Sequence, residues 1–118
     1  MSEDNTIVVK SKVFALRIIK AYQYLVKEKK EYVLSRQMLR SGTSIGANVK
    51  EAIRAQSKPD FIAKMSIALK EASETEYWIE LLQDSGYLSP KSASSLHTDC
   101  VELLKILTAI IKTTKENT

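Results

Sequence analysis

The side chains with the clearest chemical potential in this chain are basic residues that recur at steps of three and four between positions 36 and 54. They are Arg36, Arg40, Lys50 and Arg54, and the intermediate steps fall on Thr43 and Ala47. In a helix, residues at these steps share one face. Arginine and lysine on a rigid helix can neutralise phosphates and displace the counterions condensed on nucleic acid. The pattern therefore predicts a phosphate-binding face on which small residues let a backbone approach closely.

Two other interpretations of this row stay open: a solvated helix face, or a partner for acidic residues of a neighbouring helix. Residues 1–58 contain twelve Lys/Arg and five Asp/Glu, whereas residues 59–118 contain six and nine. A basic half beside an acidic half suits an anionic polymer, or complementary packing between helices or subunits. A second basic set precedes the first, and its members are Lys10, Arg17, Lys20 and Lys27.

The sequence gives little support to catalytic or metal-binding chemistry. His97 is the only histidine and no glutamate lies three residues before it, whereas di-iron sites in bundles use Glu-x-x-His pairs. Cys100 is the only cysteine, which excludes an intramolecular disulfide and a thiolate cluster, and at an apolar position it acts as a small hydrophobe. The segment 97–100, HTDC, does not bring its side chains to one point. We expect no enzyme, no metal and no cofactor.

Two glycines, Gly42 and Gly46, lie four residues apart within the stretch that carries the basic row. Each interior glycine costs a helix roughly 1 kcal/mol relative to alanine, so the pair predicts close packing against a neighbouring helix. A row of polar residues runs beside them: Gln37, Ser41, Ser44, Asn48 and Glu51. We expect this row to fix the register of assembled subunits through hydrogen bonds, or to line a cavity.

Four long periodic segments must position these side chains. They are expected at about 7–30, 35–56, 59–85 and 90–115. Ser57, two residues before Pro59, and Ser89, directly before Pro90, can each cap a helix, and Gly86 suits a helix end. The sequence predicts an all-α, antiparallel up-down-up-down four-helix bundle that forms a single domain over residues 1–118.

Apolar residues cover more of the first and fourth segments than a solitary bundle needs. The third segment has one heptad seam: Phe61, Met65, Ala68, Ala72, Thr75, Ile79 and Leu82. The fourth has the seam Leu96, Cys100, Leu103, Leu107 and Ile110, with a second apolar row at Val101, Leu104 and Ile111. Monomers rarely expose large apolar patches, so this surplus predicts self-association into a homo-oligomer, with tight packing in a small core as the alternative.

The overall composition is that of a globular domain, with 44% apolar and 27% charged residues in 118. The first residues, MSEDNT, are acidic where a secretory signal would be basic and then apolar. No run approaches the ~20 apolar residues that cross a membrane. We expect a cytoplasmic protein without a membrane segment.

The run from Gln37 to Ala52, QMLRSGTSIGANVKEA, together with the later DFIAKMSIALKEASETEYWIELL and a SGYL turn, resembles the bacterial four-helix-bundle family of ribosomal intervening-sequence (IVS) proteins. The resemblance covers about residues 7–112. The family is also similar to the accessory variability determinant of diversity-generating retroelements, which works with a reverse transcriptase. Here Gly46 stands where many members have proline, which favours a continuous second helix, and Ala52 stands where they have glycine.

The resemblance implies an antiparallel bundle that assembles as a ring-like homo-oligomer, a barrel-shaped homopentamer. It also implies binding to structured RNA or DNA and no enzymatic activity. The predicted function is a non-catalytic oligomeric scaffold or accessory protein that contacts nucleic acid through basic residues of the first two helices. Its expected partners are copies of itself, structured RNA or DNA, and a nucleic-acid enzyme such as a reverse transcriptase. The alternative is a protein-interaction module whose basic row docks an acidic partner protein.

Overall fold

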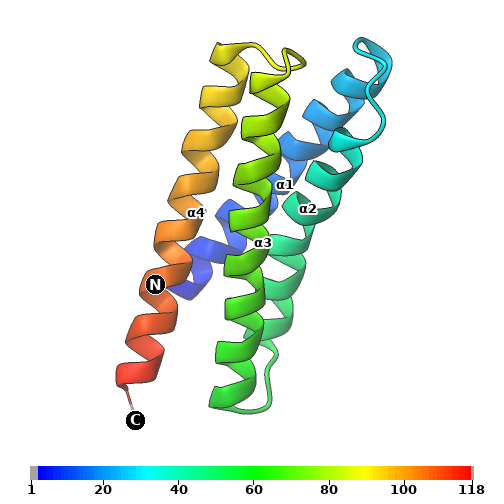
Figure 1. Ribbon diagram of the computed structural model, residues 1–118. Helices are drawn as coiled ribbons and strands as arrows, with labels where there is room; N and C mark the ends of the chain where they lie inside the picture. Colours follow the sequence, from blue (N-terminus) through cyan, green and yellow to red (C-terminus); the bar gives the residue numbers. More distant parts are fainter. Residues whose placement is uncertain (1–2, 118) are drawn as a thin grey trace.

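Four helices, joined by short connections, make up the computed structural model, which describes residues 3–117 (Figure 1). They are α1 (Glu3–Lys27), α2 (Leu34–Ile53), α3 (Lys58–Asp84) and α4 (Pro90–Glu116). The prediction of four helices and no strand is confirmed for this part of the chain. Met1, Ser2 and Thr118 lie outside it, and with them the first two residues of the acidic MSEDNT segment.

Each helix packs against two neighbours, α1 and α3 both lying between α2 and α4. The α1–α2 and α3–α4 connections lie at one end of the molecule and the α2–α3 connection at the other (Figure 1). The result is an elongated body of 49 × 21 × 21 Å. Within residues 3–117, no helix combines the length and the apolar character that a membrane span requires.

Two helix starts follow the sequence signals closely. Ser57 Oγ accepts a hydrogen bond from the Asp60 amide at 3.2 Å, and Ser89 Oγ accepts one from the Ser92 amide at 3.2 Å. In both helices a proline occupies the first turn, where its missing N–H is not needed. Gly86 ends the α3 region with a φ of 86°, a left-handed conformation that glycine adopts without strain.

The turn between α1 and α2 is organised by a buried carboxylate that the sequence analysis did not single out. Glu31 is 7% exposed and accepts hydrogen bonds from the amides of Val33, Leu34 and Ser35 at 3.1, 2.9 and 2.7 Å. Burial alone would raise the pKa of Glu31, but these bonds and one from the Ser35 side chain outweigh it and lower the pKa below 4.5. The ionised side chain therefore satisfies the first free amides of α2.

Glu31→Gln is expected to lower the free energy of unfolding by about 1–3 kcal/mol at pH 7, because an amide offers one weaker acceptor to three amide donors. A lowered pKa means that the stabilisation is present above pH 4.5 and is lost as the pH falls through the folded-state value. Thermal unfolding of both proteins at pH 7 and pH 3 measures this, and the difference between them should shrink in acid. Glu28→Gln, in an exposed position of the same turn, is the control. A loss no larger than that of the control, or one independent of pH, would contradict the assignment.

The core follows the predicted seams. All five seam residues of α4 are buried, as are the α3 seam residues except Phe61, which is partly buried. The polar member Thr75 is accommodated because its hydroxyl lies 2.8 Å from the Ser41 hydroxyl and 2.8 Å from the Glu71 carbonyl oxygen. The second apolar row of α4 is also partly buried, with Leu104 and Ile111 packed against the core.

Both glycines of α2 face α1, as the sequence predicts, but the two contacts differ in tightness. A Cβ at Gly42 would lie 2.9 Å from Cγ2 of Ile18, which is fully buried. A Cβ at Gly46 would lie 3.4 Å from Ser11 Oγ, an ordinary van der Waals contact. Close helix packing therefore requires glycine at position 42 only.

Alanine at these two positions is expected to change stability in opposite directions. Overpacking a core costs about 1–3 kcal/mol, so Gly42→Ala should lower the free energy of unfolding even after the gain in helix propensity. Gly46→Ala meets no clash and should raise it by up to ~1 kcal/mol. Thermal melts of the two variants beside the unmodified chain measure both shifts. If both substitutions stabilise the protein, Ile18 can move to make room for a Cβ at position 42, and the requirement for glycine there would be wrong.

Candidate nucleic-acid interface

The predicted basic row forms an exposed strip along α2. Its four members, Arg36, Arg40, Lys50 and Arg54, are all exposed. Among the described side chains, no carboxylate lies within 4.0 Å of their charged nitrogen atoms. The row is therefore available to an external anion. We call these four residues the α2 basic row.

The two ends of the α2 basic row have different surroundings. Arg40 shares a small pocket with Glu71 and Glu74 of α3. Burial raises the pKa of Glu71, and Glu74 raises it further, while the charge of Arg40 acts in the opposite direction. Lys50 and Arg54 line an open groove of about 470 Å³, which Lys64 and the acidic residues Glu51 and Asp60 also line. The end near Arg54 thus combines three cations with two carboxylates in one open groove.

Lys12 joins this surface, although the sequence analysis did not name it. It lines an α1–α2 groove together with Lys50, Gly46 and Ala47. Thr43 also lies in this groove and turns its hydroxyl to its own helix, donating to the Leu39 carbonyl at 2.8 Å. The packing of Ser11 against Gly46 brings Lys12, the next residue of α1, beside α2, and the sequence alone carries no signal of this contact.

The basic residues predicted as a second set on the first helix do not form one free surface in the structure. Lys10 lies 3.0 Å from Glu102, and Arg17 lies 2.5 Å from Asp99, so both are ion-paired to α4. Lys20 shares a groove with Arg17 at the α1–α4 side, and Lys27 is exposed at the end of α1. Lys10, Arg17 and Lys20 therefore lie on the side of α1 that faces α4.

The polar row of α2 makes its contacts within the chain. Ser41 meets Thr75 of α3, and Glu51 lies 3.1 Å from Lys64 of α3. Ser44 donates to the Arg40 carbonyl at 2.8 Å, and Asn48 donates to the Ser44 carbonyl at 2.9 Å. Gln37 lines the small pocket at Arg40. The observed role of Ser41 and Glu51 is to join α2 to α3.

The HTDC segment directs its side chains to three different partners. Asp99 pairs with Arg17, His97 faces α3, and Cys100 is buried with its Sγ 3.2 Å from the Ala72 carbonyl oxygen. Burial, and then the charge of Glu76, raises the pKa of the Cys100 thiol to about 12. A thiol in this state is not a nucleophile at neutral pH.

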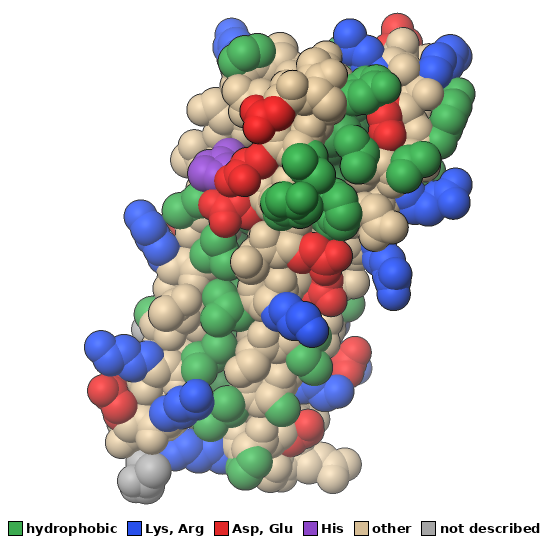
Figure 2. Space-filling view, viewed as in Figure 1, with side chains coloured by type: hydrophobic (Ala, Val, Ile, Leu, Met, Phe, Trp, Pro, Cys, Tyr) green, Lys and Arg blue, Asp and Glu red, His purple; other side chains and the backbone are tan. Residues whose placement is uncertain are grey.

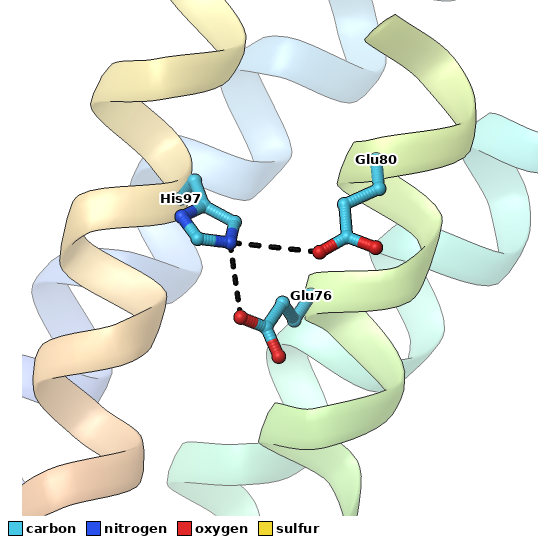
Figure 3. Close-up of side chains that lie close together, drawn as sticks. All are labelled: Glu76, Glu80 and His97. Atoms are coloured by element: carbon cyan, nitrogen blue, oxygen red, sulfur yellow. Dashed lines mark ion pairs between the residues drawn. The ribbon is translucent and has the colours of Figure 1, made fainter. Parts of the chain in front are cut away.

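One cluster brings together metal-ligating groups of α3 and α4 that were not predicted to meet. Glu76 and Glu80 of α3 point toward His97 of α4 (Figure 3). One ligand atom from each lies within 4.8 Å of the others. Acidic side chains lie beside the histidine on this face of the molecule (Figure 2). The Glu-x-x-His motif does not describe this set, because that motif lies within one helix. The set consists of a Glu pair four residues apart on one helix and a histidine on a neighbouring helix.

The comparisons with known proteins concern nearly the whole chain. The family model described as 23S rRNA-intervening sequence protein matches residues 3–109. A crystal structure of a protein with unknown function from the S23 ribosomal protein family of Bacteroides thetaiotaomicron is 53% identical, with a TM-score of 0.93, over 94% of this chain and 99% of that one. No curated protein matches. The match to the family model confirms the resemblance that the segment from Gln37 to Ala52 indicates. The chain belongs to the 23S rRNA-intervening sequence protein family.

Proposed function

We propose that this protein is a non-catalytic, oligomeric scaffold of the bacterial cytoplasm that contacts structured RNA or DNA through the α2 basic row. The observation that carries the proposal is the exposure of four cations on one face of α2, without a carboxylate within 4.0 Å in the described part of the chain. A nucleic-acid duplex carries a dense row of phosphates that such a face can neutralise.

The shape of the surface favours phosphate contacts over the reading of bases. From Arg36 to Arg54 the row extends about 27 Å at 1.5 Å per residue, which spans roughly eight nucleotide steps of 3.4 Å along one strand. No aromatic residue lies between these two positions, so stacking on bases has no platform within the row. Structured nucleic acid, which presents phosphates in a fixed arrangement, is the better ligand.

Self-association would bring several copies of the α2 basic row into one particle, each of which binds nucleic acid only weakly. Val9, Val13 and Leu16 of α1 are 52–54% exposed and follow one another at steps of four and three. We call them the α1 apolar strip, and we propose that copies of the chain pack through it into a ring. The family resemblance makes five copies the expected number. A ring presents several α2 basic rows at once, and linked weak contacts bind far more tightly than one alone.

Fluorescence anisotropy with a labelled RNA hairpin and a labelled DNA duplex tests the proposal. Four phosphate contacts predict a salt slope of about −3.6, so affinity should fall roughly 150-fold between 50 and 200 mM salt. Absence of salt-dependent binding at micromolar protein would overturn the proposal. The absorbance ratio at 260 and 280 nm of the protein purified from cells separates bound nucleic acid from an acidic protein partner, which would appear as a second band.

A further inference from the structure

Three side chains at the α3–α4 contact have the arrangement of an incomplete coordination sphere. Glu76 and Glu80 lie one turn apart on α3, so their carboxylates share the side that faces α4 (Figure 3). His97 Nε2 lies 2.9 Å from Glu76 Oε2 and 3.6 Å from Glu80 Oε2. The packing of two separate helices therefore brings one nitrogen and two oxygen ligands to one point.

We propose that Glu76, Glu80 and His97 bind a divalent transition-metal ion, for which Zn²⁺ is the best match. Tetrahedral zinc has ligand bonds of about 2.0–2.1 Å, which places neighbouring ligand atoms roughly 3.3 Å apart. The two observed separations, 2.9 and 3.6 Å, lie on either side of that value. Small rotations of two partly exposed glutamates convert the cluster into three corners of a tetrahedron.

The charges of the cluster also favour a cation. Two carboxylates face a single imidazole, and among the described side chains no lysine or arginine lies within 4.0 Å of either one. Like charges four residues apart in a helix repel each other, and a bound dication removes that repulsion. An imidazole ligand selects zinc and its neighbours over Mg²⁺ and Ca²⁺, which prefer oxygen alone.

The cluster is open enough to exchange its ion. The side chains of Glu76, His97 and Glu80 are 29%, 38% and 53% exposed. Three protein ligands leave the fourth position of zinc to water or to another molecule. The ion would cross-link α3 to α4, and it would do so on helices other than the one that carries the α2 basic row. The inference does not depend on nucleic-acid binding.

The chain has one histidine, which makes the test direct. Tag-free full-length protein, labelled with ¹⁵N, is titrated with ZnCl₂ and, separately, with MgCl₂. Calorimetry should give one zinc per chain, and the imidazole spectrum should show metal at Nε2 of His97, with no change on adding magnesium. The melting temperature should rise with zinc concentration, because only the folded chain assembles the three ligands.

Variants distinguish this site from adventitious binding. His97→Gln should weaken zinc binding at least about 100-fold, and Glu80→Gln, at a half-exposed position that does not endanger the fold, at least about 10-fold. Glu74→Gln, an exposed carboxylate of α3 outside the cluster, is the matched control and should bind zinc as the unmodified chain does. Unshifted His97 resonances, or equal zinc affinity in the Glu74 and Glu80 variants, would overturn the inference.

Discussion

Replacing the four residues of the α2 basic row with glutamine is expected to reduce the affinity for an RNA hairpin at least about 100-fold at 50 mM salt. The affinity of the variant should also lose most of its dependence on salt, because each phosphate contact contributes about −0.9 to the slope of log K against log salt. Glutamine is as good a helix former as lysine, and all four side chains are exposed, so α2 keeps its structure. Anisotropy titrations across a salt series measure both effects.

A matched variant separates the location of the charges from their number. The exposed lysines of α4 are Lys91, Lys105, Lys112 and Lys115. Their replacement with glutamine removes the same net charge from another helix and should reduce binding by less than about 10-fold. Equal losses in the two quadruple variants would mean that overall charge, and not the α2 basic row, attracts nucleic acid.

Placing aspartate in the α1 apolar strip is expected to convert the oligomer into single chains. Val13 and Leu16 are 52% and 54% exposed in the isolated chain, so Val13→Asp and Leu16→Asp leave the bundle core intact. In an assembly, each substitution would remove about 1.5–3 kcal/mol of apolar burial and place an unpaired charge between subunits. Light scattering coupled to gel filtration should report 13.3 kDa for the variants and a multiple of it for the unmodified protein.

Tyr77→Asp provides the control for the assembly experiment. Tyr77 is 53% exposed, like the strip residues, but lies on α3. This variant should remain oligomeric if the α1 apolar strip is the contact between copies. A single chain in the unmodified protein at every concentration, or aspartate variants that stay associated, would remove the ring from the proposed function.

Much of the fold could be predicted because its signals are local. A capping serine followed within two residues by a proline marks the starts of α3 and α4, and apolar steps of three and four define the core seams. The predicted start of α1 at Ile7 is four residues late, since it depended on the first apolar residue, and the predicted end at Lys30 is three residues late. Lys30 has a φ of 55°, a left-handed conformation that glycine usually marks in a sequence.

The contacts between helices could not be predicted in the same way. The faces of one helix follow from its own periodicity, so the α2 basic row could be assigned from spacing alone. The pairing of Arg17 with Asp99, the approach of Lys12 to α2, and the meeting of His97 with α3 depend on how helices rotate and slide against one another. Periodicity does not encode those two variables.

The buried thiol of Cys100 can report how often α4 separates from α3. Cys100 is the only cysteine, it is fully buried, and burial raises the pKa of its thiol to about 12, so the thiol stays protonated at pH 7. An alkylating reagent can therefore react only after α4 has moved away from α3 and water has reached the sulfur. The rate of covalent labelling, followed by mass spectrometry, would report how often these helices separate in the unmodified protein. A ligand that cross-links α3 to α4 should lower this rate.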